Sequence, residues 1–572
     1  MRINTLAYLL CILFIVIYNK SLYANCDGIC KDTSVIKSLF NPKITGTINI
    51  GIWYNQKGGT APNAASTQKL DWFIQGQPTI TIANMSFPFS GVYSNNDFNY
   101  SQPFNQYGLS PSYKWATAHM GYRNLAFGSY TLSGATFLGG GLELNPGKFR
   151  FAAFYGRFNR AIEEDTNIIK TTGVTIIPAY KRIGYGVKLG IGSDVNFIDF
   201  SFVKIQDDTS SIHRPTLNTI SPSDNLLVGI SNKLKFGKHF KWESEGAYSI
   251  YTEDQQAFGN EIQQKVPQFA RSIVSLNIST TLNPAYKMMF GFGSKIFDIT
   301  AQYEYIGPNY RSLAMYYIQN DVVRYTVNPS LRIWQGKINL SGSYGLQEDN
   351  LSKLKLATTL RLVKSLNISL TPMNRINIQA NYSNFGTTQS SGKIQLNDSI
   401  RISQINASYG GTVSMLIPSK GFPSNITVNI TQQSVNDLNV LTQKFSKSDV
   451  FLTTFNYGLT ISKLKLNVNI GIVRAAIQSY SGEVVNAGPS FSASTSLFKN
   501  KCRINLGSTY QDRRINGKSD GSIFTISSGF NFTVFKKQII GIRYQYTLNT
   551  TTTTSIYYIT QNRLGFTYGY SF

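Results

Sequence analysis

The chain has 572 residues, of which only 15% are charged and 13% are aromatic, and its formal net charge is +25. Ordinary soluble domains carry roughly 25% charged residues. Beyond the N-terminus the chain has no apolar run long enough for a membrane helix. This composition argues against a soluble domain and a helical membrane protein, and favours a large membrane β-barrel.

Residues 1–24 are predicted to be a secretory signal peptide. Arg2 supplies the positive start, residues 6–18 form an apolar run, and Ala24 provides a small residue before a cleavage point. Export would keep the chain away from nucleic acid, so the basic charge is expected to face lipid headgroups, a lumen or periplasmic partners.

Residues 25–43 lack strand patterning and are predicted to form a short periplasmic tail. Within it, Cys26 and Cys30 are candidates for a small disulfide loop in an oxidising periplasm, and two free thiols are the alternative. The segment 32–36 faintly resembles the box that TonB-dependent receptors present to their partner. Strand-like alternation begins at Ile44, where such a receptor would place its plug domain, so this interpretation is disfavoured.

Residues 44–572 are predicted to form an all-β, transmembrane, antiparallel up-and-down barrel. Strands are expected at 44–53 and 79–88, and the irregular residues 89–115 are expected to be a long loop that enters the lumen or lines its mouth. From Trp115 onward, turn signals recur about every 43 residues, which fits two tilted strands, a short turn and a longer loop. These signals are Pro146-Gly147, Gly192-Ser193-Asp194, Gly237-Lys238, Asn283-Pro284, Gln335-Gly336, Pro372-Met373, Ser419-Lys420-Gly421, Ser462-Lys463, Lys499-Asn500 and Lys536-Lys537.

The last nine residues show the clearest strand pattern in the chain. Apolar and aromatic side chains alternate there with Gly, Thr and Ser, so one face would meet lipid and the other water. A terminal Phe after such alternation resembles the signal by which outer-membrane barrels are recognised for insertion. This strand should pair with the first strand, either near 44–53 or near Trp115, giving roughly 22–26 strands. The predicted assembly signal comprises Leu564, Phe566, Tyr568, Tyr570 and Phe572.

Several segments resemble a set of large outer-membrane barrels of Bacteroidota. They are residues 111–115, 130–134, 139–141 and 145–148, a second block at 307–315 with 319–321, and a third at 382–385. Ala314 stands where that set has a glycine. The resemblance implies a barrel fold in the outer membrane of a Gram-negative bacterium, and it implies no particular activity or site.

Basic residues at the strand positions that alternate with the apolar, lipid-facing positions are candidates for the lumen or its rims. Rings of Arg and Lys favour anions in pores, although residues beside short turns would equally meet solvent or headgroups. The loop at 307–321 is expected either to constrict the lumen or to cap its outer mouth. The basic candidates are Arg324, Arg332, Lys337, Arg361, Arg375, Lys465, Arg503, Arg543 and Arg563.

Catalysis is not expected, and neither a cofactor nor a metal site is predicted. Asp207, Asp208 and His213 share one segment, but no acids from opposite strands are expected to support them as a general-base site. The glycines at 139–141 would either bend the barrel wall or let an inner loop or ligand approach it closely.

The predicted function is therefore a non-enzymatic pore or transport channel for small solutes, with a mild anion preference. The alternative is a structural or partner-binding barrel within a larger outer-membrane assembly or secretion complex. Expected partners are outer-membrane lipids, the barrel-assembly machinery and a periplasmic or lipoprotein partner, with no nucleic acid.

Overall fold

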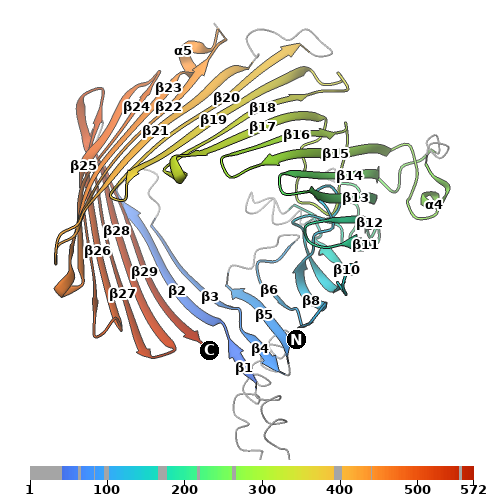
Figure 1. Cartoon of the computed structure of the whole chain (residues 1–572), viewed down its shortest axis with the longest axis horizontal. Helices are drawn as coiled ribbons and strands as arrows, with labels where there is room; N and C mark the ends of the chain where they lie inside the picture. Colours follow the sequence, from blue (N-terminus) through green and yellow to red (C-terminus); the bar gives the residue numbers. More distant parts are fainter. Residues whose placement is uncertain are drawn as a thin grey trace, which may run out of the picture.

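The chain forms one antiparallel sheet that closes on itself (Figure 1). The ring closes because β2 (Thr47–Gly59) pairs with β3 (Thr67–Gly76) on one side and with the last strand, β29 (Tyr557–Ser571), on the other. The predicted barrel is thus confirmed, and its first strand is the one near 44–53. This computed structural model describes residues 42–61, 66–82, 84–95, 102–164, 177–215, 220–259, 266–391, 402–439, 441–552 and 557–572.

The sheet contains 29 strand segments, and three pairs of segments each make one wall strand, so the barrel has 26 strands. Gly46, with a φ of 107°, interrupts the first of these wall strands. Pro78 and Pro111 interrupt the other two, because proline has no N–H for the strand ladder. The interrupted strands are β1 (Lys43–Thr45) with β2, β3 with β4 (Thr79–Ile82), and β6 (Gln106–Leu109) with β7 (Ser112–Tyr113).

The remaining strands follow in chain order around the ring, each paired with its neighbours in sequence. They are β5 (Met85–Ser94), β8 (Ala116–Asn124), β9 (Thr136–Leu144), β10 (Phe149–Asn159), β11 (Arg182–Gly192), β12 (Phe197–Asp207), β13 (Asp224–Phe236), β14 (Phe240–Thr252), β15 (Thr280–Gly293), β16 (Phe297–Ile306), β17 (Val322–Ile333), β18 (Ile338–Asp349), β19 (Ala357–Met373), β20 (Ile376–Ser391), β21 (Ser403–Ile417), β22 (Ser424–Asp437), β23 (Ser448–Ile461), β24 (Leu466–Ser479), β25 (Gly482–Leu497), β26 (Cys502–Ile515), β27 (Lys518–Phe535) and β28 (Gln538–Thr551).

Helical segments are short. They are α4 (Gln268–Arg271), α5 (Gln443–Ser446), and the 3-10 turns η2 (Trp334–Gly336) and η4 (Ser462–Leu464). Among the described residues, no helix has the length and apolar character needed to cross a membrane.

Each strand presents an apolar outer face and a different inner face. On β11, Tyr185, Leu189 and Ile191 are exposed outward, and the intervening positions are Gly186, Lys188 and other glycines. In β29, Leu564 and Phe566 are likewise exposed on the outer face. Alternation of this kind places apolar side chains around the outside of the ring and small or polar side chains on the inside.

One predicted turn is wrong. Asn283 and Pro284 lie inside β15, and the chain reverses at residues 294–296 instead. The proline is tolerated because β16 pairs with β15 only from Ala285 onward, so no strand needs an N–H from Pro284 on that side. The carbonyl of Pro284 still accepts a hydrogen bond from the N–H of Gly307 at 2.9 Å.

The expectation of one long loop at 89–115 is also wrong. Most of its described residues belong to the barrel wall, in β5, β6 and β7. Short strands broken by proline and glycine hide the alternation on which the prediction depended. Gly108, for example, faces inward, where an added Cβ would lie 2.7 Å from the guanidinium carbon of Arg123. Residues 96–101 lie outside the described part of the chain.

Candidate functional site

Two segments between strands fold against the inner face of the wall and are called here the inner plug: residues 125–135, between β8 and β9, and residues 307–321, between β16 and β17. Tyr310 donates a hydrogen bond from its hydroxyl to the carbonyl of Tyr130 at 2.6 Å, and Ser312 donates to the carbonyl of Thr131 at 2.7 Å. Leu132 and Tyr310 are completely buried. The two segments are therefore one packed unit, although they are about 180 residues apart in sequence.

A dry apolar layer joins the plug to the wall. The ring centroids of Phe137 and Phe154 lie 5.0 Å apart, with the rings tilted by 36°, and both belong to the same buried cluster as Leu132 and Tyr310. Inward-facing glycines make room for this layer: a Cβ on Gly186 would lie 2.7 Å from the ring of Phe154. The plug is consequently held by packing as tight as that of a soluble core.

Charged groups on the wall also anchor the plug. The hydroxyl of Tyr130 donates to Glu304 at 2.7 Å, and Glu304 accepts from Arg324 at 2.8 Å. Lys287 donates to the hydroxyl of Ser129 at 2.8 Å. Burial raises the pKa of Tyr130 and of Tyr310, so both hydroxyls stay protonated as donors at physiological pH.

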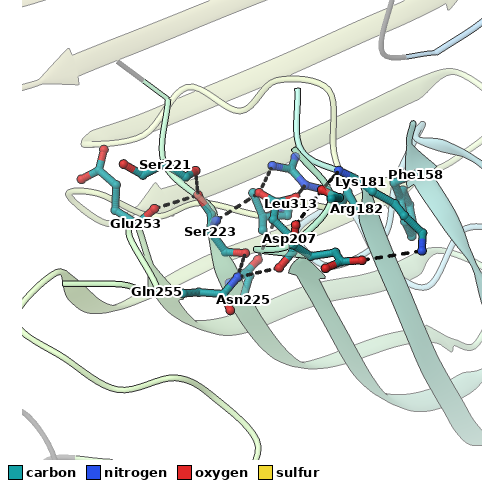
Figure 2. Close-up of polar contacts among 12 residues, drawn as sticks. Phe158, Lys181, Arg182, Asp207, Ser221, Ser223, Asn225, Glu253, Gln255 and Leu313 are labelled. Carbon is teal, nitrogen blue, oxygen red and sulfur yellow. Dashed lines mark hydrogen bonds and ion pairs between the residues drawn. The ribbon is translucent and has the colours of Figure 1, made fainter. Parts of the chain in front are cut away.

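A polar network ties the plug to the rim of the barrel (Figure 2). The carboxylate of Asp207 accepts from Arg182 Nε at 2.8 Å and Nη2 at 2.9 Å, and from the N–H of Ser223 at 3.0 Å. Deeper in the network, Asn225 Oδ1 accepts from the N–H of Leu313, in the plug, at 3.1 Å. Bidentate pairing of this kind fixes geometry, so this rim is rigid where the plug meets it.

The plug covers only one part of the lumen wall. Its contacts run along β9 to β17, where inward-facing charges are largely paired: Arg150 with Asp199, and Arg182 with Asp207. Residues 351–572 instead carry 23 Lys and Arg against 6 Asp and Glu. Between described residues of that stretch, the ion pairs are those of Arg513 with Asp520 and Arg514 with Asp512. The basic excess therefore lies mainly away from the plug.

The wall away from the plug is polar on its inside. A hollow there is lined by hydroxyl and amide side chains of β23 to β27 together with neighbouring backbone. Its residues are Asn456, Asn469, Ser490, Phe491, Ser492, Gly507, Ser508, Thr509, Thr525 and Ser527. Side chains that donate and accept hydrogen bonds without charge are typical of a surface that water and polar solutes can wet.

Strand register distributes the nine predicted basic residues between the inner face and the short turns. Arg324 and Arg332 face inward but are paired, with Glu304 at 2.8 Å and Asp298 at 2.9 Å respectively. The residues on inward-facing strand positions are Arg324, Arg332, Arg361, Arg503, Arg543 and Arg563. The residues in short turns are Lys337, Arg375 and Lys465.

Three of these basic side chains have defined contacts that the sequence did not predict. Arg563 lies over the ring of Trp53 at 4.5 Å, and Arg361 lies 5.7 Å from the ring of Phe385. In a turn, Lys465 donates to Asn500 Oδ1 at 3.1 Å.

The glycines at 139–141 combine both interpretations offered by the sequence. A Cβ on Gly139 would overlap the backbone carbonyl of Tyr155 on the next strand, so this glycine permits a bend in the wall. A Cβ on Gly141 would lie 2.9 Å from the side chain of Leu125, so that glycine admits the plug.

A feature that the sequence did not predict lies on the outer face of the barrel. The described residues 253–259 and 266–279, called here the outer flap, include α4 and pack Val266, Ala270 and Val274 over the outward side chains of β13 and β14. Figure 1 shows α4 outside the ring of strands. Beneath the flap, Lys204 and Asp224 form a buried ion pair, and the N–H of Ser275 donates to Asp224 at 2.9 Å.

The other sequence candidates do not form a reactive site. Asp207 is held by Arg182, and His213 is exposed beside Glu163 at 3.4 Å. No group of metal-ligating side chains occurs among the described residues. Cys502 is a buried free thiol, whereas Cys26 and Cys30 lie outside the described residues.

The terminal strand meets the start of the barrel. The N–H of Phe572 donates to the carbonyl of Gly46 at 3.0 Å, and Tyr568 and Tyr570 pair with Ile50 and Ile48 of β2. The predicted assembly signal therefore lies on the strand that closes the ring.

The chain matches no protein-family model and no curated protein. Several solved structures match with low scores. OccAB1 of Acinetobacter baumannii has a TM-score of 0.33 at 9% identity, over 60% of this chain and 91% of that one. OpdQ of Pseudomonas aeruginosa has a TM-score of 0.32 at 10% identity, over 60% of this chain and 94% of that one. OccAB2 of Acinetobacter baumannii has a TM-score of 0.29 at 10% identity, over 93% of this chain and 98% of that one.

Proposed function

We propose that this chain is an outer-membrane channel for small polar solutes, and that solutes pass along the part of the lumen that the inner plug leaves uncovered. The observation that carries the proposal is the division of the lumen. The wall at β9 to β17 is filled by the plug, whereas the wall from β18 through β29 to β2 is lined with hydroxyl, amide and basic side chains.

Barrel size makes this division meaningful. The interior of a barrel with 26 strands is too wide for strand side chains alone to fill. The plug fills the space over only part of the wall, so the polar remainder is the natural aqueous path. Placement in the outer membrane, after export by the signal peptide, is part of the proposal and is supported by the apolar outer faces of the strands.

A mild anion preference follows from charge. Residues 351–572 have 17 more basic than acidic side chains, and few of the described ones are neutralised by ion pairs. Some of these basic side chains face inward, among them Arg361, Arg503, Arg543 and Arg563. Low-dielectric walls focus the potential of these inward-facing charges into the lumen, which raises the local anion concentration. The ion pairs on the plugged side contribute little to this potential, because the cation of each pair has an adjacent carboxylate.

Planar-bilayer recording of the purified, folded chain tests this proposal. In a potassium chloride gradient we expect stable conductance and a reversal potential whose sign shows that chloride is more permeant than potassium. Correctly folded protein without conductance would refute the channel, and a reversal potential on the potassium side would refute the anion preference.

A second candidate function is a partner-binding barrel within a larger assembly. It is favoured by apolar side chains exposed in the long connections, among them Phe258 in the outer flap and Tyr317 in the plug segment. Purification in mild detergent decides this point: a stoichiometric co-purifying protein would support it, and a chain that remains alone would count against it.

A further inference from the structure

We infer that the inner wall at the barrel closure, where β28, β29 and β2 meet, carries a binding site for small oxyanions, built from Arg543, Arg563 and Trp53. This inference deepens the proposed channel function by assigning a ligand class, carboxylate or phosphate, and a position in the lumen. It rests on register, on one stacking contact and on the absence of neutralising acids among the described neighbours of the two arginines.

Arg543 stands between two glycines. Its cross-strand neighbours on the inner face are Gly529 of β27 and Gly565 of β29. Directly opposite residues in a sheet have their Cβ atoms about 5 Å apart, so larger neighbours would crowd the guanidinium. The two glycines leave room for side chains of the next strands, because a Cβ on Gly529 would overlap the amide of Asn505 and a Cβ on Gly565 would overlap the ring of Trp53. Arg543 is therefore flanked by an uncharged amide and an aromatic ring, and its own side chain is exposed.

Trp53 uses the space above one of these glycines. It is the residue opposite Gly565 on β2, and a Cβ at Gly565 would overlap its indole ring. The ring therefore lies across the wall between the positions of Trp53 and Arg543. A large residue at position 565 would push the ring away, so the glycine is required for this arrangement.

Arg563 is held in place by the same indole. Its guanidinium carbon lies 4.5 Å from the ring centroid of Trp53. Stacking satisfies the face of a guanidinium while leaving the N–H donors at its edge available, and it reduces the freedom lost when an anion binds. Arg563 lies two residues before Gly565 on β29, so it is a diagonal neighbour of Arg543. The two guanidinium groups are thus placed to contact one oxyanion or the two ends of a small dianion.

The carboxylate opposite Trp53 on the next strand is already engaged. Asp71 of β3 lies opposite Trp53, on the side away from Arg543. Lys69 pairs with it at 2.9 Å, and Asn55 Nδ2 donates to it at 3.1 Å. The local charge at the closure therefore remains positive. Guanidinium donors suit the planar geometry of carboxylates and phosphates better than they suit chloride.

Calorimetric titration of the full, detergent-solubilised barrel with succinate, inorganic phosphate and glycerol tests the inference without requiring conductance. We expect saturable binding of succinate or phosphate and none of glycerol, and binding of only one anion would identify its chemical class. R543Q and R563Q should each weaken binding about tenfold, the size of one lost charge-assisted contact. W53A should weaken it about threefold by releasing Arg563.

Two variants provide matched controls, and heat-modifiable mobility checks the folding of every variant. Arg474→Gln removes an exposed arginine on the outer face of β24, and Arg361→Gln removes a lumen arginine far from the closure. Neither should change the affinity. The inference is overturned if no anion binds saturably, or if the controls weaken binding as much as R543Q does. Saturable binding without conductance would refute the proposed channel function and support the oxyanion site. Anion-selective conductance without saturable binding would support the channel and refute the site.

Discussion

Replacing Tyr310 tests whether the inner plug restricts the lumen. Tyr310 is completely buried, and its hydroxyl donates to the carbonyl of Tyr130 at 2.6 Å. In Y310F the carbonyl loses its donor inside a dry cluster, which should cost about 1–2 kcal/mol of local plug stability. In Y310A the lost ring adds a cavity, for a total of about 3–5 kcal/mol.

These free energies translate into opening of the plug without unfolding of the barrel, because the strand ladders are unchanged. Hydrogen exchange should therefore accelerate by about 5–30-fold in residues 125–135 and 307–321 of Y310F, and more in Y310A, while the wall strands keep their protection. Single-channel conductance should rise in the same order. Tyr317→Phe is the matched control, because Tyr317 is an exposed tyrosine of the same segment. Unchanged exchange and conductance in Y310A would refute the idea that these segments restrict the lumen.

Three further predictions follow from other parts of the barrel. Loss of the final strand should abolish membrane assembly because the ring cannot close, and Phe572→Ala should abolish it because the terminal aromatic of the predicted assembly signal is lost; normal levels of heat-modifiable barrel would contradict this. Gly186→Val should destabilise the plug by about 1–3 kcal/mol through overpacking, measurable as faster plug exchange, whereas Gly411→Ala, which has nothing within 4 Å, should be neutral. Lys204→Ala should cost about 3–5 kcal/mol by leaving Asp224 buried and unpaired, so proteases should cut the outer flap sooner. The double variant Lys204→Met with Asp224→Leu should restore protection, and equal cleavage of single and double variants would argue against the ion pair as the flap's anchor.

The alternation of apolar and polar residues at every second position is the feature of this sequence that predicts the barrel fold. The outer face of a barrel strand meets lipid regardless of which strands lie beside it, so local pattern alone predicts the apolar parity of segments such as 564–572. Short turns are equally local, and Pro146-Gly147 and Lys536-Lys537 fall between strands as expected. The same reasoning failed at Pro284, where a turn-forming residue lies inside β15, one residue before the pairing with β16 begins.

Contacts between distant segments were decided by tertiary structure alone. Nothing local to residues 125–135 indicates that they pack against residues 307–321, because their shared cluster forms only when the sheet curves and both segments fold against its inner face. The outer flap is hidden for the same reason, and Lys204 even breaks the apolar parity that its neighbours obey. At the closure, parity predicted that Arg543 and Arg563 face inward, but only the register that joins β29 to β2 places the ring of Trp53 against Arg563. Alternation reports what each residue faces, whereas ring closure determines which residues meet.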